Sequence, residues 1–151
     1  MALDDDIRIL SSVSLFEGFT PEQLRLLAFG AESMKLSAGR DLFEEGTEAD
    51  SAYVVARGGV VLYRERDGER AIVGYAGAGV MLGELALIAE TTRLTSARAE
   101  VDTDLLRLSR KLFRRILEEY PEVALMLHER IAGQLQAMIR RIEGLAPRFA
   151  S

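Results

Sequence analysis

The 151-residue sequence contains no cysteine and only one histidine, His128. Without cysteine the chain forms no disulfide, presents no thiolate nucleophile and builds no cysteine-ligated metal site. A single histidine also argues against the multi-histidine metal sites of cupin enzymes, which share a jelly-roll barrel. We therefore expect no metal. No nucleophile is paired with a base, so we expect no enzyme either.

The sequence also lacks an excess of positive charge. Its 19 lysines and arginines are outnumbered by 24 acidic residues, which gives a formal net charge of −5. Nucleic-acid binding depends largely on clustered basic side chains that neutralise phosphates, so we expect no direct DNA binding by this chain. The basic pairs at 110–111, 114–115 and 140–141 lie among acidic residues and are typical of solvated helix faces.

Long hydrophobic runs are absent as well. No apolar stretch approaches the length needed to span a bilayer, and residues 1–6 are acidic where a secretory signal would be basic. We therefore expect a cytoplasmic protein without a membrane partner. The hydrophobic content of 48% and only three prolines favour one folded domain over residues 1–151.

Residues 1–31 are predicted to form an N-terminal helical segment. Their apolar residues recur at helical spacing around a break at Gly18. Thr20, followed by Pro21 and then by Gln23, is typical of a capped helix start.

Residues 32–109 have the pattern of a string of antiparallel strands. Runs at 51–56, 60–63 and 71–75 are rich in valine, isoleucine and tyrosine, and Gly or Asp-Gly separates them. The segment 66–69 predicts a hairpin turn in which Gly68 adopts a positive φ. We expect these strands to close into a jelly-roll barrel. The predicted fold is thus mostly β with flanking helices.

Residues 110–145 are predicted to form two C-terminal helices, a short one over 111–119 and a long one from 122 to about 144. The long helix carries apolar residues at alternating steps of four and three, a heptad seam interrupted by one histidine. This pattern favours a parallel homodimer, and the alternative is a helix packed on its own barrel. The seam consists of Ala124, His128, Ile131, Leu135, Met138, Ile142 and Leu145.

The segment 83–96 carries the chemistry expected of a sugar-phosphate site. Gly83 allows backbone to approach a ligand closely, and the short helical turn after it presents N–H groups to an anion. Arg93 can bind two phosphate oxygens at once. Glu84 would be repelled by that phosphate, so we expect its carboxylate to accept a hydrogen bond from a hydroxyl such as a ribose 2′-OH.

This segment, L-G-E-L-A-L-I-A-E-T-T-R-L-T-S, resembles the phosphate-binding cassette of the cyclic-nucleotide-binding domain family. The family includes catabolite activator proteins, protein kinase A regulatory subunits and cyclic-nucleotide-gated channels, and the similarity extends over nearly the whole chain. The cassette departs from the family pattern at Thr92, which replaces a proline, and at Thr95, which replaces an alanine. The resemblance implies a cyclic-nucleotide-binding β-roll, with a cassette helix between its strands.

The resemblance also implies which residues meet the ligand. The phosphate and ribose would be held by Gly83, Glu84, Leu85, Ala86, Arg93, Thr95 and Ser96. The base would lie between the barrel wall and the long helix, against Leu62, Val73, Gln134 and Met138. Leu94 lacks the hydroxyl that often accompanies guanine preference in the family, so cAMP is favoured over cGMP as the regulatory ligand.

The expected function is a regulatory domain that signals through helix rearrangement and dimerisation. The sequence ends just after the long helix, where an activator of this family continues into a helix-turn-helix. Three modes of output stay open: a free-standing sensor with a protein effector, a sensor domain of a longer protein, or a degenerate domain. The degenerate domain would act as a ligand-independent dimerisation or protein-interaction scaffold.

Overall fold

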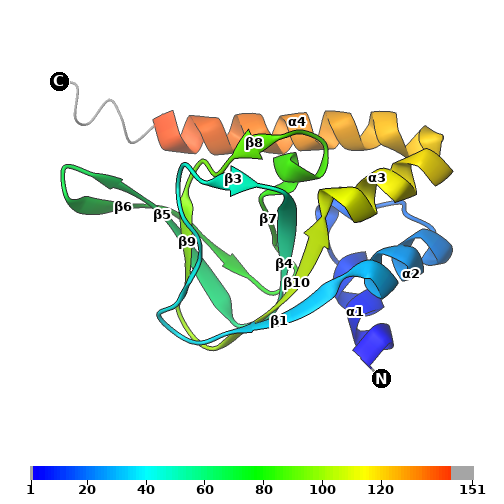
Figure 1. The fold of residues 1–151 in the computed structure, drawn as a ribbon, viewed down its shortest axis with the longest axis horizontal. Helices are drawn as coiled ribbons and strands as arrows, with labels where there is room; N and C mark the ends of the chain where they lie inside the picture. The colour runs from blue at the N-terminus through cyan, green and yellow to red at the C-terminus, as the bar shows by residue number, and fades with distance from the viewer. Residues whose placement is uncertain (1, 144–151) are drawn as a thin grey trace.

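Two four-stranded antiparallel sheets form the barrel, with strand orders β1-β10-β4-β7 and β2-β9-β5-β6, and a short β3-β8 ribbon lies at one end (Figure 1). The computed structural model describes residues 2–143, apart from the side chains of positions 2, 138, 141 and 143. The strands are β1 (Glu32–Leu36), β2 (Asp41–Phe43), β3 (Glu48–Ala49), β4 (Ser51–Arg57), β5 (Gly59–Arg66), β6 (Glu69–Gly77), β7 (Met81–Leu82), β8 (Thr91–Thr92), β9 (Ser96–Ala99) and β10 (Thr103–Ser109).

Helices flank the barrel at both ends of the sequence, and a short 3-10 helix interrupts the strands. Figure 1 shows α1 and α2 on one side of the barrel and α4 running along its top. The helices are α1 (Ala2–Ser11), η1 (Ser14–Phe16), α2 (Pro21–Gly30), η2 (Glu84–Leu87), α3 (Arg110–Glu119) and α4 (Pro121–Glu143). The predicted β-roll with N-terminal helices, a cassette helix and a long C-terminal helix is therefore confirmed.

Local sequence signals form the structures expected of them. Thr20 accepts a hydrogen bond from the backbone N–H of Gln23, and the Gln23 side chain accepts one from the backbone N–H of Thr20, which completes a capping box at α2. Asp67 and Gly68 join β5 to β6 with φ angles of 56° and 79°. Both values are positive, as a two-residue hairpin turn requires.

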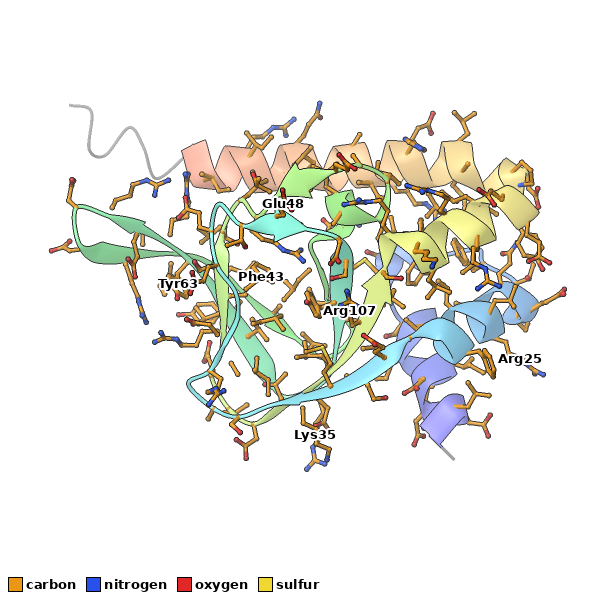
Figure 2. The ribbon with its side chains drawn as sticks, in the orientation of Figure 1. Arg25, Lys35, Phe43, Glu48, Tyr63 and Arg107 are labelled. Carbon is orange, nitrogen blue, oxygen red and sulfur yellow. The ribbon has the colours of Figure 1, made fainter. Side chains whose placement is uncertain are left out.

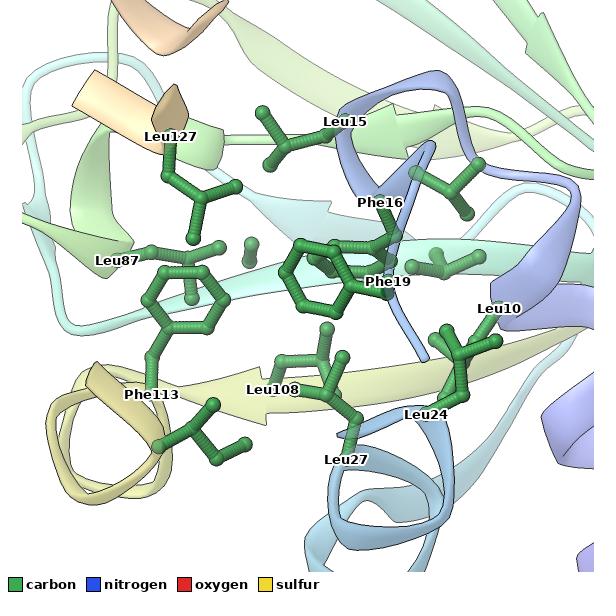
Figure 3. Packing of buried hydrophobic residues seen from close by; sticks show 14 of the residues in the cluster. Leu10, Leu15, Phe16, Phe19, Leu24, Leu27, Leu87, Leu108, Phe113 and Leu127 are labelled. Atoms are coloured by element: carbon green, nitrogen blue, oxygen red, sulfur yellow. The ribbon is translucent and has the colours of Figure 1, made fainter. Parts of the chain in front are cut away.

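Strand β4 separates two hydrophobic clusters because its side chains alternate between faces. Tyr53 and Val55 point into the barrel, whereas Ala52 and Val54 pack against the helices. Figure 3 shows the helical cluster, where side chains from every flanking helix meet. Its members in that view include Leu10, Leu15, Phe16, Phe19, Leu24, Leu27, Leu87, Leu108, Phe113 and Leu127.

Helix α4 is anchored through its first half. Val123, Leu127 and Ile131 lie on one face, and Leu127 and Ile131 are fully buried. Burial of each such side chain contributes roughly 1.5–3 kcal/mol. Arg130 adds two hydrogen bonds from its guanidinium to the carbonyl oxygens of Leu15 and Glu17, at 3.0 and 2.6 Å. Beyond Ile131, no α4 side chain that the structure describes is buried.

The position of Ile131 departs from the predicted heptad seam. This side chain belongs to the core of its own chain and cannot contact a partner chain. Apolar residues at steps of three and four fit several neighbouring stripes of one helix, so the heptad pattern alone does not identify which stripe is buried. Leu145, the last seam residue, lies outside the described residues, as does the side chain of Met138.

Candidate ligand-binding site

The cassette begins with a left-handed residue and a short helix. Gly83 has a φ of 75° and precedes η2. This conformation favours glycine because a β-carbon is strained there. Ala86 and Leu87 are buried, and Leu87 joins the helical core, so the turn is anchored from within the protein. The prediction of a short helix between strands at this position is confirmed.

Arg93 follows β8, and both its backbone N–H and its carbonyl oxygen form hydrogen bonds. Its N–H donates to the Thr47 carbonyl oxygen, and its carbonyl oxygen accepts from the Gly46 N–H, both at 2.8 Å. The side chain is only 7% exposed. Its Nε and Nη1 atoms have no hydrogen-bond partner among the described residues. Burial lowers the pKa of the guanidinium, and nearby Tyr53 and Asp50 partly oppose that shift.

The guanidinium of Arg93 fits into space left by Gly83. A β-carbon added at position 83 would collide with Nη1 of Arg93. The positive φ favours glycine here, and a β-carbon would also force the end of the Arg93 side chain to shift. The structure thus brings together two of the residues that the sequence assigned to phosphate binding.

Thr95 and Ser96 are both buried but lie in different surroundings. Thr95 lines a cavity beside the cassette. The Ser96 hydroxyl accepts a 2.9 Å hydrogen bond from the backbone N–H of Glu45, and Ser96 does not belong to the cavity wall. In this structure Ser96 therefore joins β9 to the loop after β2.

The cavity lies between the cassette, the barrel and α4, and it encloses about 50 Å³. Pockets that hold drug-sized ligands usually measure roughly 300–1,000 Å³. A nucleotide would therefore have to displace some of the lining. The lining consists of Phe43, Ala49, Leu62, Leu82, Gly83, Glu84, Leu85, Ala86, Thr91, Thr92, Arg93, Leu94, Thr95 and Leu135.

Three of the four residues assigned to the base have described side chains, and these three occupy different places. Leu62 lines the cavity. Val73 packs against the same barrel cluster but lies at a bulge opposite Leu62 and Tyr63, outside the cavity wall. Gln134 lines a separate cavity of about 520 Å³ between the N-terminal segment and α4, which Glu84 also borders. The side chain of Met138 lies outside the described residues.

Sequence reasoning did not assign Phe43 or Leu135 to the site. Leu135 extends from α4 over the cassette, although the heptad pattern had placed it on a dimer seam. Phe43 ends β2, and its ring lies 4.4 Å from the guanidinium carbon of Arg93. The sequence contained no local signal for either contact, because both join segments that are distant along the chain.

Two classes of feature are absent from the part of the chain that the structure describes. No group of three or more histidine, aspartate or glutamate side chains there could hold a metal ion. None of its helices has the length and apolar character needed to cross a membrane.

The chain is similar to one region of much longer curated proteins. It is 29% identical over 134 residues to lysophospholipase NTE1 of Chaetomium globosum, and 29% identical over 136 residues to lysophospholipase nte1 of Aspergillus fumigatus. These alignments cover 88% and 89% of this chain. The chain spans only 9% of the length of each of these curated relatives.

Solved structures share the fold over most of the chain. A cyclic nucleotide-binding-like protein from Brucella abortus is 60% identical with a TM-score of 0.70, covering 76% of this chain and 99% of that one. The regulatory domain of Toxoplasma gondii PKA, solved with cAMP, is 28% identical with a TM-score of 0.71. The match covers 76% of this chain and 44% of that one. The family model of the cyclic nucleotide-binding domain matches residues 33–120. This chain therefore belongs to the cyclic nucleotide-binding domain family.

Proposed function

We propose that this chain is a non-enzymatic, cytoplasmic regulatory domain that binds a cyclic nucleotide monophosphate, with cAMP favoured over cGMP. The observation that carries the proposal is the buried guanidinium of Arg93, a residue that lines the cavity and whose Nε and Nη1 atoms have no hydrogen-bond partner in the described part of the chain. A buried cation without partners is costly, and an anion that enters the cavity would supply them. Glu84 lines the same cavity and would accept a hydrogen bond from the ribose.

Ligand binding would couple to helix α4. The cavity is too small for a nucleotide while Leu135 covers the cassette. The second half of α4 contributes no buried side chain that the structure describes, so it is the element that can move at least cost. A ligand shifts this equilibrium only by binding the open arrangement more tightly than the closed one. A protein effector could recognise the displaced helix.

The outer face of α4 supports a homodimer, although on a different stripe from the predicted seam. Leu125, Ala132 and Ile139 recur every seven residues and are exposed, as is His128. One apolar position in each heptad is half of the a and d pattern through which a helix pairs with a second copy. We propose this stripe as the dimer contact.

A second function is favoured by the size of the cavity. A cavity of about 50 Å³ is small for a nucleotide, which also fits a degenerate domain that no longer admits ligand. In that case the chain would serve as a ligand-independent dimerisation or protein-interaction scaffold. Direct binding measurements separate the two functions.

Calorimetry with cAMP, cGMP and AMP on the parent chain tests the proposal. We expect both cyclic nucleotides to bind, with cAMP tighter, and AMP to bind much more weakly. Arg93→Ala should weaken cAMP binding roughly thirtyfold to several hundredfold, which corresponds to about 2–4 kcal/mol. Arg98→Ala is the matched control, because Arg98 lies on β9 and pairs with Asp41 outside the cavity. Equal affinities of Arg93→Ala and the parent would overturn the assignment.

A further inference from the structure

Two aromatic rings surround the guanidinium of Arg93. The carbon at its centre lies 4.4 Å from the centroid of the Phe43 ring and 5.6 Å from that of Tyr53. The two rings are 6.0 Å apart and inclined by 30°. Phe43 comes from β2 and Tyr53 from β4, so strands of both barrel sheets contribute to this aromatic cradle. Figure 2 shows Phe43 inside the barrel.

The aromatic cradle stabilises the positive charge of Arg93, a role that hydrogen bonds to carboxylates fill for other arginines of the barrel. Arg64 and Arg98, on neighbouring strands, each donate from Nε to a carboxylate, at 2.9 and 3.0 Å. Arg93 has no such partner among the residues that the structure describes, and its Nε and Nη1 atoms are buried there without hydrogen bonds. An aromatic face attracts a cation through the ring quadrupole, and this attraction strengthens where water is excluded. Phe43 and Tyr53 are therefore the groups in direct contact with the guanidinium that favour its charge, and the carboxylate of Asp50 adds a charge interaction.

The sheet fixes the position of Phe43. Its backbone pairs with that of Ala97 in β9, and Ala97 is fully buried. The backbone of Arg93 is held by Gly46 and Thr47, three and four residues after Phe43. The ring and the guanidinium are thus both attached to the same loop, and their contact does not depend on the placement of α4.

We propose that Phe43, with Tyr53 behind it, is a positioning residue for Arg93. The aromatic cradle keeps the guanidinium desolvated and at the cavity wall before ligand arrives, so that little side-chain freedom is lost on binding. Part of this inference rests on the proposed function, since the benefit to affinity requires an anionic ligand. The placement of Arg93 in the unliganded protein is independent of the proposed function.

The first experiment uses no ligand. Phenylglyoxal modifies accessible arginine side chains, and mass spectrometry reports the rate at Arg93 in the folded protein. Phe43→Leu should raise that rate roughly three- to tenfold, the factor expected for loss of a partly desolvated cation–π contact. Phe43→Tyr retains an aromatic face and should label like the parent. Tyr53→Leu is a second variant and should raise the rate by less, because its ring lies farther away.

Phe16→Leu is the matched control for the first experiment. It makes the same substitution at a buried residue of the helical cluster, whose ring packs against Phe19 and Phe113 and makes no cation–π contact among the described residues. General loosening of the fold would raise the labelling rate in Phe16→Leu as well. A rate at Arg93 that does not change in Phe43→Leu would overturn the proposal. Equal increases in Phe43→Leu and Phe16→Leu would overturn it too.

The second experiment measures cAMP affinity in a double-mutant cycle. Phe43→Leu should weaken binding roughly three- to tenfold in the parent and leave it unchanged in Arg93→Ala, because the ring acts through the guanidinium. The same loss in both backgrounds would overturn the positioning role. If the parent binds neither cAMP nor cGMP, the proposed function fails, and the labelling experiment alone decides whether Phe43 holds Arg93.

Discussion

The Nε of Arg110, the first residue of α3, donates a 2.8 Å hydrogen bond to the carbonyl oxygen of Ala86 in the cassette. The same guanidinium donates from Nη2 to the carbonyl oxygen of Ala49 at 2.5 Å. The backbone N–H of Arg110 donates to the Asp50 carbonyl oxygen at 2.8 Å. One residue therefore joins the start of the C-terminal helices to the cassette and to the junction between β3 and β4.

Replacing Arg110 with lysine should weaken the attachment of α3 to the cassette and to the end of β3. A lysine keeps the charge but cannot donate two hydrogen bonds in the fixed geometry of a guanidinium, so at least one carbonyl loses its partner. We expect Arg110→Lys to lower the free energy of unfolding by about 1–2 kcal/mol. Urea denaturation followed by circular dichroism measures this loss.

Arg114→Lys is the control for that variant, since Arg114 is exposed on the same helix. It should change the free energy of unfolding by less than about 0.5 kcal/mol. Equal stabilities of the two variants would show that the Arg110 hydrogen bonds contribute nothing to the folded state.

Gly83→Ala and Gly68→Ala form a matched pair. Their φ angles are 75° and 79°, so a β-carbon should cost each variant about 1–2 kcal/mol of stability. At Gly83 the β-carbon also meets Nη1 of Arg93, whereas at Gly68 it meets no atom within 4 Å. Urea unfolding should therefore report similar losses for both, and calorimetry should report weaker cAMP binding for Gly83→Ala alone. Unchanged binding in Gly83→Ala would contradict the assigned position of the guanidinium.

The features that could be predicted from the sequence are those that depend on residues close together along the chain. The capping box at Thr20 and the hairpin turn at Gly68 each depend on residues within one turn of chain. The cassette turn at Gly83 was found in the same way, because a glycine followed by a short helical pattern is a local signal. The strands were predicted from β-branched runs whose ends glycines mark.

Contacts between distant segments could not be predicted in this way. Packing of Ile131 against the N-terminal helices turns α4 so that Leu135 covers the cassette, and helical periodicity alone does not select that rotation. Val73 lies at a bulge between β5 and β6 and does not line the cavity described, and a register shift of this kind has no local signal in the sequence. The contact of Arg93 with Phe43 joins the segment after β8 to the end of β2, which are distant along the chain.

The role of Glu84 can be tested with a modified ligand. If its carboxylate accepts a hydrogen bond from the ribose 2′-OH, 2′-deoxy-cAMP should bind the parent at least tenfold more weakly than cAMP does, a factor of about 1.4 kcal/mol. In Glu84→Gln the two ligands should differ much less, because the partner has already been weakened. Isothermal titration of both ligands against both proteins measures the coupling. If the loss of binding free energy from the 2′-deoxy ligand and the loss from Glu84→Gln add in full, the carboxylate and the hydroxyl are not partners.

The outer stripe of α4 gives the last prediction. Leu125 is 73% exposed and Ile139 is 37% exposed, and neither lines the cavity. Lysines at both positions would place like charges across a parallel helix pair, so Leu125→Lys with Ile139→Lys should be monomeric by sedimentation where the parent is a dimer. Its cAMP affinity should stay within about threefold of the parent's, because the cavity wall is intact.

Phe29→Lys is the control for the stripe, because Phe29 is 81% exposed on α2, away from α4's outer face. It replaces an exposed apolar side chain with lysine outside the stripe and should leave the dimer intact. Substitution at Ile131 would not serve, since that residue is fully buried in the core of its own chain and its loss would unfold the anchor of α4. An unchanged mass for the double lysine variant, or a monomeric parent at micromolar concentration with and without cAMP, would rule out the stripe as a dimer contact.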